Sequence, residues 1–252
     1  MGLSLGLGAS SSSYVSEYLP TEISNLLIWA STDTLNTDTV DSTTGEVQAW
    51  TNRAATASGG LGGQFKAIDA NRGPIANNAR TEITFSGTTN GDSLELKDSN
   101  NNTANADLEI QEGYTICMIV TNEGMDSGST FAGSSLNSPS RLTFFDTDVI
   151  QIRTHGGSTT NLAAEGIEDD VFFSLIIVVE DGQSNNCRTF INNTETATDT
   201  ISENFRFGQL GGNGGNSLNN APTKMKQVIV YGKALNEAER NALYTNYIAP
   251  AI

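Results

Sequence analysis

The chain has 252 residues, 17% of them charged, and a formal net charge of −16. Nucleic-acid affinity depends mainly on Lys and Arg side chains that neutralise phosphates, so this charge balance argues against nucleic acid as a partner. No stretch approaches the roughly twenty consecutive apolar residues that a membrane-spanning helix needs, and we therefore expect no membrane insertion. The apolar runs described below exclude a disordered chain.

The first twenty residues differ in composition from the rest of the chain. Leucines that alternate with Gly or Ser precede a serine run at 10–13. The segment is either a disordered tail, as Gly and Ser at a terminus usually indicate, or an arm that adds to a neighbouring subunit as a strand. In the second alternative the partner-binding residues are Leu3, Leu5, Leu7, Tyr14 and Tyr18. We expect an arm at 1–20, one domain at 21–252, and no secretory signal, because a basic head is missing.

Short apolar or alternating runs, separated by Gly, Asn, Asp and Ser, predict many strands joined by turns. The expected strands are Leu26–Ala30, Gln48–Thr51, Glu82–Phe85, Ser93–Leu96, Tyr114–Val120, Leu142–Phe145, Val149–Arg153, Val171–Val179, Cys187–Ile191 and Met225–Tyr231. A Trp within an apolar strand is usually a core residue, although an exposed Trp can stack on a sugar. We expect Trp29 and Trp50 to be buried.

Turn residues predict two hairpins among these strands. Residues 90–92 lie between the third and fourth strands, and residues 146–148 lie between the sixth and seventh. The fifth strand, at 114–120, is apolar on both faces, which is typical of a strand in the middle of a layered structure.

The sequence predicts a short helix at the end of the chain. Asn236 is placed as an N-cap that accepts a hydrogen bond from the amide of Glu239, and Glu237 adds negative charge at the positive end of the helix dipole. Apolar residues then recur every three to four positions up to Ile248, and Pro250 ends the helix. A helix of this length is marginal alone in water, so we expect it to dock on a sheet.

The segments "VIVYGKALNEAERNALYTNYI" and "LLIWASTDTL…GEVQAWTNRA" resemble the closing and opening segments of laminin-G-like, or concanavalin A-like, jelly-roll domains. Between them, "RTEITFSG", "YTICMIVT", "FFSLIIVVEDG", "CRTFINNT" and "FRFGQLGG" follow in the expected order. The resemblance covers residues 26–248. It implies an all-β fold, a two-sheet antiparallel jelly-roll sandwich with a short C-terminal helix, preceded by an extended arm.

The sequence offers no catalytic residues. Glycan-cleaving members of the concanavalin-like class usually carry Glu-x-Asp-x-x-Glu on one strand. Glu109 and Glu112 have the wrong spacing, and Asp169 and Asp170 point to opposite faces of a strand. His155 is the single histidine, no Gly-x-Ser-x-Gly nucleophile accompanies it, and we expect it in an exposed loop. We therefore predict that the protein is not an enzyme.

We expect no metal or other cofactor, with calcium as the alternative that stays open. One histidine and two separated cysteines cannot supply a zinc site. Laminin-G-like domains and lectins often bind calcium through loop Asp and Asn residues, and Asp146 with Asp148, near Asp126, is the candidate here. Asp in a turn bonds its own backbone just as readily. Cys117 and Cys187 lie within strands, and we expect buried thiols unless their strands are neighbours.

Jelly rolls in short chains that begin with a Gly/Leu/Ser arm resemble accessory virion proteins of tailed, in particular marine, bacteriophages. This resemblance implies a capsid-decoration, fibre or tail component on the virion surface. Its arm would bind other virion proteins within a homo-oligomer or a larger assembly, and its jelly roll would contact cell-surface glycans. The alternatives are a free carbohydrate-binding lectin or adhesion module and a glycan-cleaving enzyme, which the missing carboxylate pair opposes.

Overall fold

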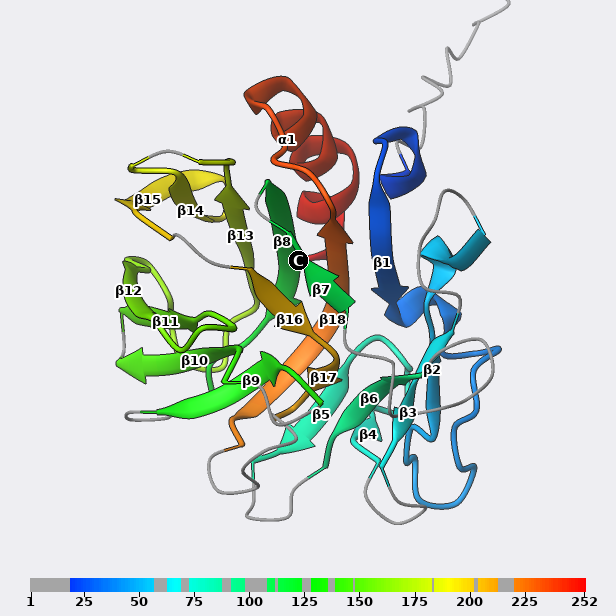
Figure 1. Cartoon of the computed structure of the whole chain (residues 1–252). Helices are drawn as coiled ribbons and strands as arrows, with labels where there is room; N and C mark the ends of the chain where they lie inside the picture. Colours follow the sequence, from blue (N-terminus) through cyan, green and yellow to red (C-terminus); the bar gives the residue numbers. More distant parts are fainter. Residues whose placement is uncertain are drawn as a thin grey trace, which may run out of the picture.

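The computed structural model describes residues 19–56, 63–68, 73–87, 92–97, 108–111, 113–123, 128–135, 139–146, 148–182, 184–201, 204–212 and 220–252. These residues form two antiparallel sheets that share one core, and a C-terminal helix (Figure 1). The all-β sandwich predicted from the sequence is therefore confirmed. No helix within this part of the chain is both long and apolar enough to cross a membrane.

The strand order shows how the chain passes between the sheets. The first sheet runs β15 (Thr194–Asp199), β14 (Cys187–Ile191), β13 (Phe173–Val179), β8 (Tyr114–Val120), β18 (Pro222–Tyr231), β5 (Ile83–Ser86), β4 (Ile75–Ala76), and β1 (Leu26–Ser31) also pairs with β18. The second sheet runs β12 (Thr159–Ala163), β11 (Val149–Arg153), β10 (Arg141–Asp146), β9 (Ser129–Gly133), β17 (Gln209–Leu210), β6 (Leu94–Lys97), β3 (Gln64–Ala67), β2 (Ala49–Thr51). A third pair joins β7 (Leu108–Ile110) to β16 (Phe205–Phe207).

The main core lies between the inner faces of the two sheets. Leu175 and Ile177 of β13 point into it from the first sheet, and Leu142 and Ile150 point into it from the second. All four side chains are fully buried. Their alternation with residues on the opposite faces follows from the two-residue period of a strand.

The outer face of the first sheet carries a second apolar cluster. Ile119 of β8 and Ile229 of β18 contribute to this cluster together with Leu243 and Ile248 of the C-terminal helical segment. Helix α1 (Glu237–Leu243) thus lies on this sheet, beside the ends of β8 and β18 (Figure 1). β8, the strand predicted to be apolar on both faces, is apolar because one face packs in the main core and the other packs under the C-terminal helical segment.

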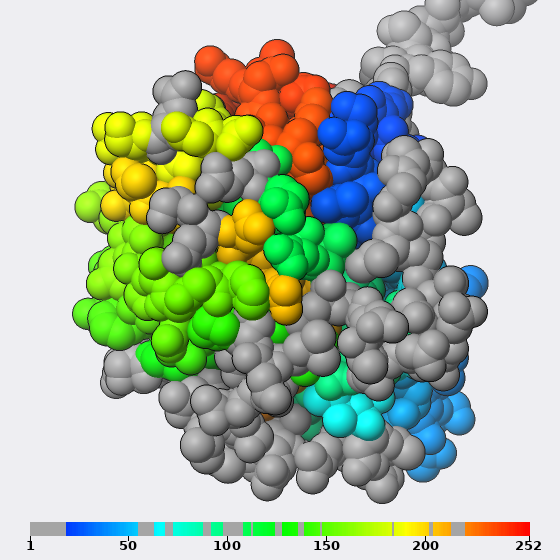
Figure 2. All heavy atoms as spheres, viewed as in Figure 1, coloured from blue at the N-terminus to red at the C-terminus, as the bar shows by residue number. Residues whose placement is uncertain are grey.

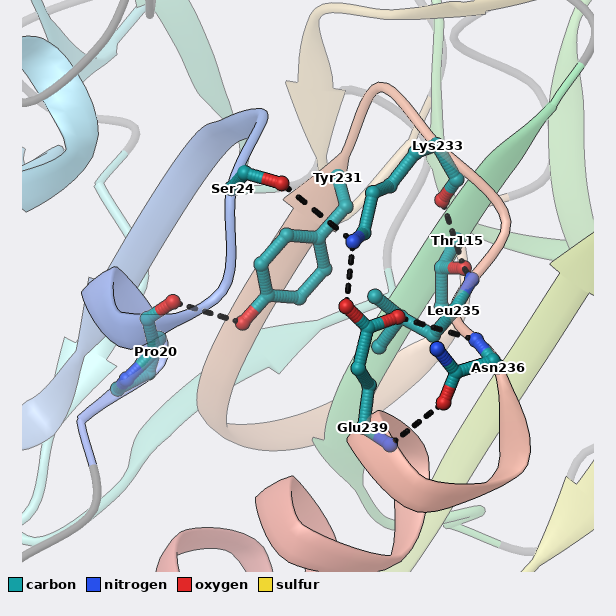
Figure 3. Close-up of polar contacts among 8 residues, drawn as sticks. All are labelled: Pro20, Ser24, Thr115, Tyr231, Lys233, Leu235, Asn236 and Glu239. Carbon is teal, nitrogen blue, oxygen red and sulfur yellow. Dashed lines mark hydrogen bonds and ion pairs between the residues drawn. The ribbon is translucent and has the colours of Figure 1, made fainter.

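Hydrogen bonds fix the start of α1 (Figure 3). The Asn236 side chain accepts from the Glu239 amide at 3.0 Å, and the Glu239 carboxylate accepts from the Asn236 amide at 3.1 Å. This reciprocal pair is a capping box, which confirms the predicted N-cap. Thr115 Oγ1 of β8 donates to the Lys233 carbonyl at 3.0 Å and accepts from the Leu235 amide at 2.9 Å, so the loop before the helix is held to the sheet.

The first described residues of the chain are held at the same place. The Tyr231 phenol donates to the Pro20 carbonyl at 3.0 Å, and Lys233 Nζ contacts both Ser24 Oγ and the Glu239 carboxylate (Figure 3). The segment that leads out of residues 1–18 is therefore attached to the end of β18 and to α1.

The prediction of a hairpin between the third and fourth expected strands was wrong. β5 pairs with β4 and β18 of the first sheet, whereas β6 pairs with β3 and β17 of the second. The residues between the two strands carry the chain from one sheet to the other. Local turn chemistry does not distinguish a hairpin from such a crossover.

The prediction that Pro250 ends the helix was also wrong in detail. The α-helix ends at Leu243, a π turn follows at Tyr244–Ile248, and a 3₁₀ turn at Ala249–Ala251 contains Pro250. Proline is tolerated in the first turn of a helical segment because the amide that it lacks has no partner there.

Other predictions for the core are confirmed. Trp29 and Trp50 are buried; the Trp50 indole donates to the Ser31 carbonyl at 2.9 Å. Cys117 and Cys187 are buried free thiols on β8 and β14, which β13 separates. Burial raises the pKa of both thiols, that of Cys187 to about 12.

Candidate functional site

The outer face of the second sheet differs from its inner face along β10, β11 and β12. Arg141, Gln151 and Arg153 are half-buried on this face, while Thr159 and Asn161 are exposed. The residues between them, such as Leu142 and Ile152, lie in the core. We call the set Arg141, Gln151, Arg153, Thr159 and Asn161 the arginine face. The strands that carry it form the left side of the molecule, drawn in green (Figure 2).

Strand register places the two arginines side by side. Arg141 of β10 is the direct partner of Arg153 of β11, and Arg141 is also the partner of Gly133 of β9. Gly133 in turn faces Gln209 of β17. Arg153, Arg141, Gly133 and Gln209 therefore form one row across four neighbouring strands. This row is about 14 Å long, since strands lie roughly 4.8 Å apart.

Gly133 contributes no side chain to this row. A Cβ at this position would lie 2.5 Å from the Ser140 carbonyl oxygen, so the close approach of the β9–β10 hairpin requires glycine. On one side of this gap stand the two guanidinium groups, and on the other stands the carboxamide of Gln209.

The two guanidinium groups lack a carboxylate in the described part of the protein. None of the ion pairs there includes Arg141 or Arg153. Arg153 donates from Nε to the Gly157 carbonyl at 3.2 Å, but Arg141 Nε is buried and has no hydrogen-bond partner among the described residues. Burial, and then the charge of Arg153, lower the pKa of Arg141. Both effects mean that an anion at this position would be favourable.

On the other side of Gly133, Gln209 also has a buried polar atom that lacks a hydrogen bond to any described residue. Gln209 is 3% exposed, and its Oε1 atom is buried without a hydrogen-bond partner in the described part of the chain. Buried polar groups are normally satisfied, so unsatisfied ones mark places where a ligand or water completes the structure. The row thus combines two cations without carboxylates and two unsatisfied polar atoms.

The next row on the arginine face is already satisfied. Gln151 Nε2 donates to Asn161 Oδ1 at 2.8 Å, and the Thr130 and Thr143 hydroxyls lie 3.4 Å apart. These bonds hold the carboxamides in place beside the arginines. Planar amide and guanidinium groups on a rigid sheet are suited to binding hydroxyl and carboxylate groups.

A third arginine lies at one edge of the site. The Arg206 amide donates to Ser140 Oγ at 3.1 Å, which ties β16 to the residue before Arg141. The Arg206 guanidinium pairs with the Glu109 carboxylate at 2.7 Å, and this hydrogen bond is the main cause of the lowered pKa of Glu109. Arg206 therefore differs from Arg141, because its charge is already neutralised.

The residues predicted for partner binding lie outside the described residues. These residues are Leu3, Leu5, Leu7, Tyr14 and Tyr18. What the structure describes is the base of the predicted arm, where Pro20 is bound by Tyr231.

The calcium prediction is only partly covered. Asp146 ends β10 and Asp148 directly precedes β11, as expected for the turn of this hairpin, and Asp126 lies outside the described residues. Within the described ranges, no group of three or more His, Cys, Asp or Glu is arranged to hold a metal ion. His155 lies in the turn after β11, half-buried rather than exposed as predicted.

The structure brings together two carboxyl groups that sequence reasoning did not connect. Asp170 forms a hydrogen bond with Glu123, which raises the pKa of Asp170. Lys224 pairs with Glu123 at 3.1 Å. The carboxyl groups of glycoside hydrolases lie about 5–9.5 Å apart to accommodate the substrate, whereas these two share a hydrogen bond. The pair therefore lacks the geometry of that chemistry.

Solved structures share this architecture. The binding domain of Paraclostridial Mosquitocidal Protein 1 superposes with a TM-score of 0.61 at 13% identity, over 91% of this chain and 53% of that chain. The botulinum neurotoxin serotype D ligand binding domain, in complex with N-acetylneuraminic acid, superposes with a TM-score of 0.58 at 13% identity, over 89% of this chain and 51% of that chain. Trypanosoma rangeli sialidase, in complex with sialic acid, superposes with a TM-score of 0.54 at 14% identity, over 88% of this chain and 33% of that chain.

These likenesses show that the chain has a β-sandwich fold of the kind found in these binding domains and in the sialidase. The chain spans about half the length of the toxin domains and a third of the sialidase. At these identities the likeness concerns the fold. No known protein family matches the sequence, and none of the curated proteins matches it either.

Sequence reasoning missed the arginine face, although a signal was present. A hairpin closed by residues 146–148 pairs residue 145 with residue 149, and counting back along both strands places Arg141 opposite Arg153. The expected strand began at Leu142, one residue too late to include Arg141. Gly133 and Gln209 could not be added by counting, because β17 lies far away in the sequence.

Proposed function

We propose that this protein is a non-enzymatic, lectin-like binding module whose arginine face binds acidic glycans. The observation that carries this proposal is the adjacent pair of arginines, which no described carboxylate neutralises, in a chain of net charge −16. Two like charges placed directly opposite each other destabilise a sheet, and a bridging anion would remove this cost. A carboxylate or sulfate on a sugar supplies such an anion, and its hydroxyl groups suit the neighbouring carboxamides.

The comparisons support this proposal at the level of fold. Two of the similar structures, the neurotoxin domain and the sialidase, contain a carboxylated sugar. Because this chain covers only part of each, the place where they bind that sugar is not transferred to it. The proposed site rests on Arg141 and Arg153 alone.

A binding titration tests the proposal with N-acetylneuraminic acid and its methyl ester, which carries no charge. We expect the acid to bind more tightly than the ester, and R141Q/R153Q to weaken binding of the acid at least about tenfold, because charge-assisted hydrogen bonds are worth about 1.5–3 kcal/mol each. R188Q is the matched control, since Arg188 is paired with Glu180 on the other sheet. Equal affinity for acid and ester in the wild type would contradict the proposal.

The finer proposal is that the module is an accessory protein on the surface of a bacteriophage virion, attached by residues 1–20. This proposal is supported by the resemblance of the chain to accessory virion proteins of tailed bacteriophages. It is also supported by the hydrogen bond from Tyr231 to Pro20, at the end of the sandwich away from the arginine face. Removing residues 1–18 should abolish association with virions and leave the sandwich folded by circular dichroism. Continued association of the shortened protein would contradict the arm as the anchor.

A further inference from the structure

A cavity of about 540 Å³ lies on the outer face of the first sheet, between the end of β1 and the last helical turns. Its volume is in the range of sites that enclose a small ligand. None of the residues around it belongs to the arginine face, so the cavity is separate from the proposed glycan site. The lining comprises Ser31, Thr32, Asp33, Gln227, Asn246, Tyr247, Pro250 and Ala251.

Most polar side chains of the lining are bonded within the protein. The Tyr247 hydroxyl group accepts from the Trp29 indole at 2.8 Å and also forms a hydrogen bond with Ser31. The Gln227 oxygen is buried and therefore closed to a ligand. Three further bonds run from Thr32 Oγ1 to the Thr81 carbonyl at 3.1 Å, from Asn246 Nδ2 to the Ala242 carbonyl at 2.9 Å, and from Arg53 to the Asp33 carboxylate at 2.6 Å.

The cavity therefore offers mainly carbon surface. The Tyr247 ring meets the Trp29 ring edge to face, with centroids 5.8 Å apart, and is fixed in place. Pro250 is exposed at the rim, and Ala251 beside it is half-buried. Ile252, the next residue, is 38% exposed. Such a surface favours an apolar occupant, because covering it removes apolar area from water.

The charges beside the cavity favour an occupant without charge. Lys226 Nζ donates to the main-chain oxygens of Ala251 and Ile252 at 3.0 and 2.8 Å, and the Asp33 carboxylate is paired with Arg53. A charged group that entered the cavity would lose hydration and gain no free counter-charge. The expected occupant is apolar and uncharged.

The first seven residues of the chain have this chemistry. Leu3, Leu5 and Leu7 alternate with Gly or Ser, so in an extended conformation the three leucines lie on one face. No charged side chain occurs in residues 1–16, whereas 17% of the residues in the whole chain are charged. The leucines thus match the cavity in both polarity and charge.

The path of the chain brings these leucines within reach of the cavity. Tyr231, the partner of Leu26 at the start of β1, binds the Pro20 carbonyl (Figure 3). The cavity lies at the other end of β1, beside Ser31, and five steps along a strand cover about 17 Å. A linker of the length and Ser-rich composition of residues 8–18 spans about 17–20 Å on average. Because linker and distance match, the effective concentration of the leucines at the cavity is in the millimolar range, above that of a second copy in dilute solution.

We propose that Leu3, Leu5 and Leu7 fold back along β1 and dock into this cavity of the same chain. The docked segment covers Pro250 and Ile252 and makes the leucines inaccessible to other proteins. An arm that binds a virion must then leave the cavity first, so docking is a self-inhibiting contact. The inference does not depend on the virion role or on the arginine face, because docking is a property of the single chain and is tested without a partner.

Disulfide trapping between introduced cysteines tests this proposal on the full chain. L5C/N246C places one thiol on the arm and the other at the rim of the cavity, and L5C/A238C is the matched control. Asn246 and Ala238 are both exposed, so neither change should alter the fold. The native Cys117 and Cys187 are buried thiols of raised pKa and react slowly.

The control position lies nearer to the base of the arm than the cavity does. Ala238 lies on α1 beside Glu239, and Lys233 Nζ contacts both Glu239 and Ser24. Random collisions of the arm would therefore favour the L5C/A238C disulfide, and only docking would favour the L5C/N246C disulfide.

With oxidised glutathione, we expect L5C/N246C to form an internal disulfide at least about tenfold faster than L5C/A238C, seen as a faster-moving monomer on a non-reducing gel. Adding L3S and L7S to both pairs should bring the two rates together, because the arm then lacks the apolar side chains that hold it. Equal rates in the two original pairs would overturn the proposal, and so would a difference that survives L3S/L7S. A disulfide-linked dimer of L5C/N246C in place of the internal disulfide would also overturn it, since the arm would then occupy the cavity of a second copy.

Discussion

The two sheets of this protein use their outer faces differently. The outer face of the first sheet is apolar and lies under α1, where Leu243 and Ile248 complete a second core cluster. The outer face of the second sheet at β10–β12 is polar, and its arginines have no described carboxylate partner. One face contributes to the stability of the fold. The other keeps groups that cost stability unless something binds them.

This difference indicates where to look for function in this sandwich. Apolar packing needs no functional explanation, because each buried apolar side chain stabilises the fold. Adjacent like charges and buried unsatisfied atoms do not stabilise it. Among the described residues such atoms also occur elsewhere, for example on Ser174 and Arg206, but the Arg141–Gln209 row combines two of them with two adjacent cations. The arginine face lies at such a place.

The largest expected loss of stability comes from a change in the helix that covers the outer face of the first sheet. Leu243 is fully buried beneath the sheet, and L243A should reduce the free energy of unfolding by about 2–5 kcal/mol through lost transfer energy and a new cavity. Urea unfolding followed by fluorescence measures it. T159A on the arginine face is the control, because an exposed residue should change stability by less than about 0.5 kcal/mol. A loss in L243A as small as that in T159A would mean that α1 does not stabilise the sheet.

A smaller effect concerns the start of α1. N236A removes the acceptor of the Glu239 amide and should cost about 1 kcal/mol. T245A, an exposed change in the same helical segment, serves as the control. If both variants unfold at the same urea concentration as the wild type, the capping box contributes nothing and the helix is held by its apolar contacts alone.

Much of the fold could be predicted because its central strands carry a strong signal. The predicted strands at 114–120 and 187–191 have the observed ends, since apolar β-branched runs there are bounded by turn residues. The capping box was visible for the same reason: it is a local pattern. The pairing of β5 and β6 was not local. Each strand found its neighbours in a different sheet, and no residue between them encodes that choice.

The candidate site was harder to predict, because no single residue in it is distinctive. Arg141 and Arg153 acquire meaning only through a register that sets them opposite each other. Unsatisfied atoms are a property of packing, which the sequence does not display.

The smallest expected effect is a gain in stability on the arginine face. It distinguishes the two outer faces most clearly, because most substitutions lower stability. Arg141 and Arg153 are direct partners, so R141Q should raise the free energy of unfolding by about 0.5 kcal/mol by relieving like-charge repulsion. The same variant should bind N-acetylneuraminic acid less tightly. Urea unfolding at low and high salt measures the stability change, and the gain should shrink at high salt because ions screen the repulsion.

R188Q gives the matched comparison for this sign. Arg188 is paired with Glu180 at 2.9 Å, so its loss should leave stability unchanged or lower it by up to about 1 kcal/mol. A variant that stabilises the fold while weakening binding is expected of a residue retained for a ligand rather than for packing. If R141Q instead destabilised the protein as R188Q does, Arg141 would be a structural residue, and the outer faces of the two sheets would both serve the stability of the fold.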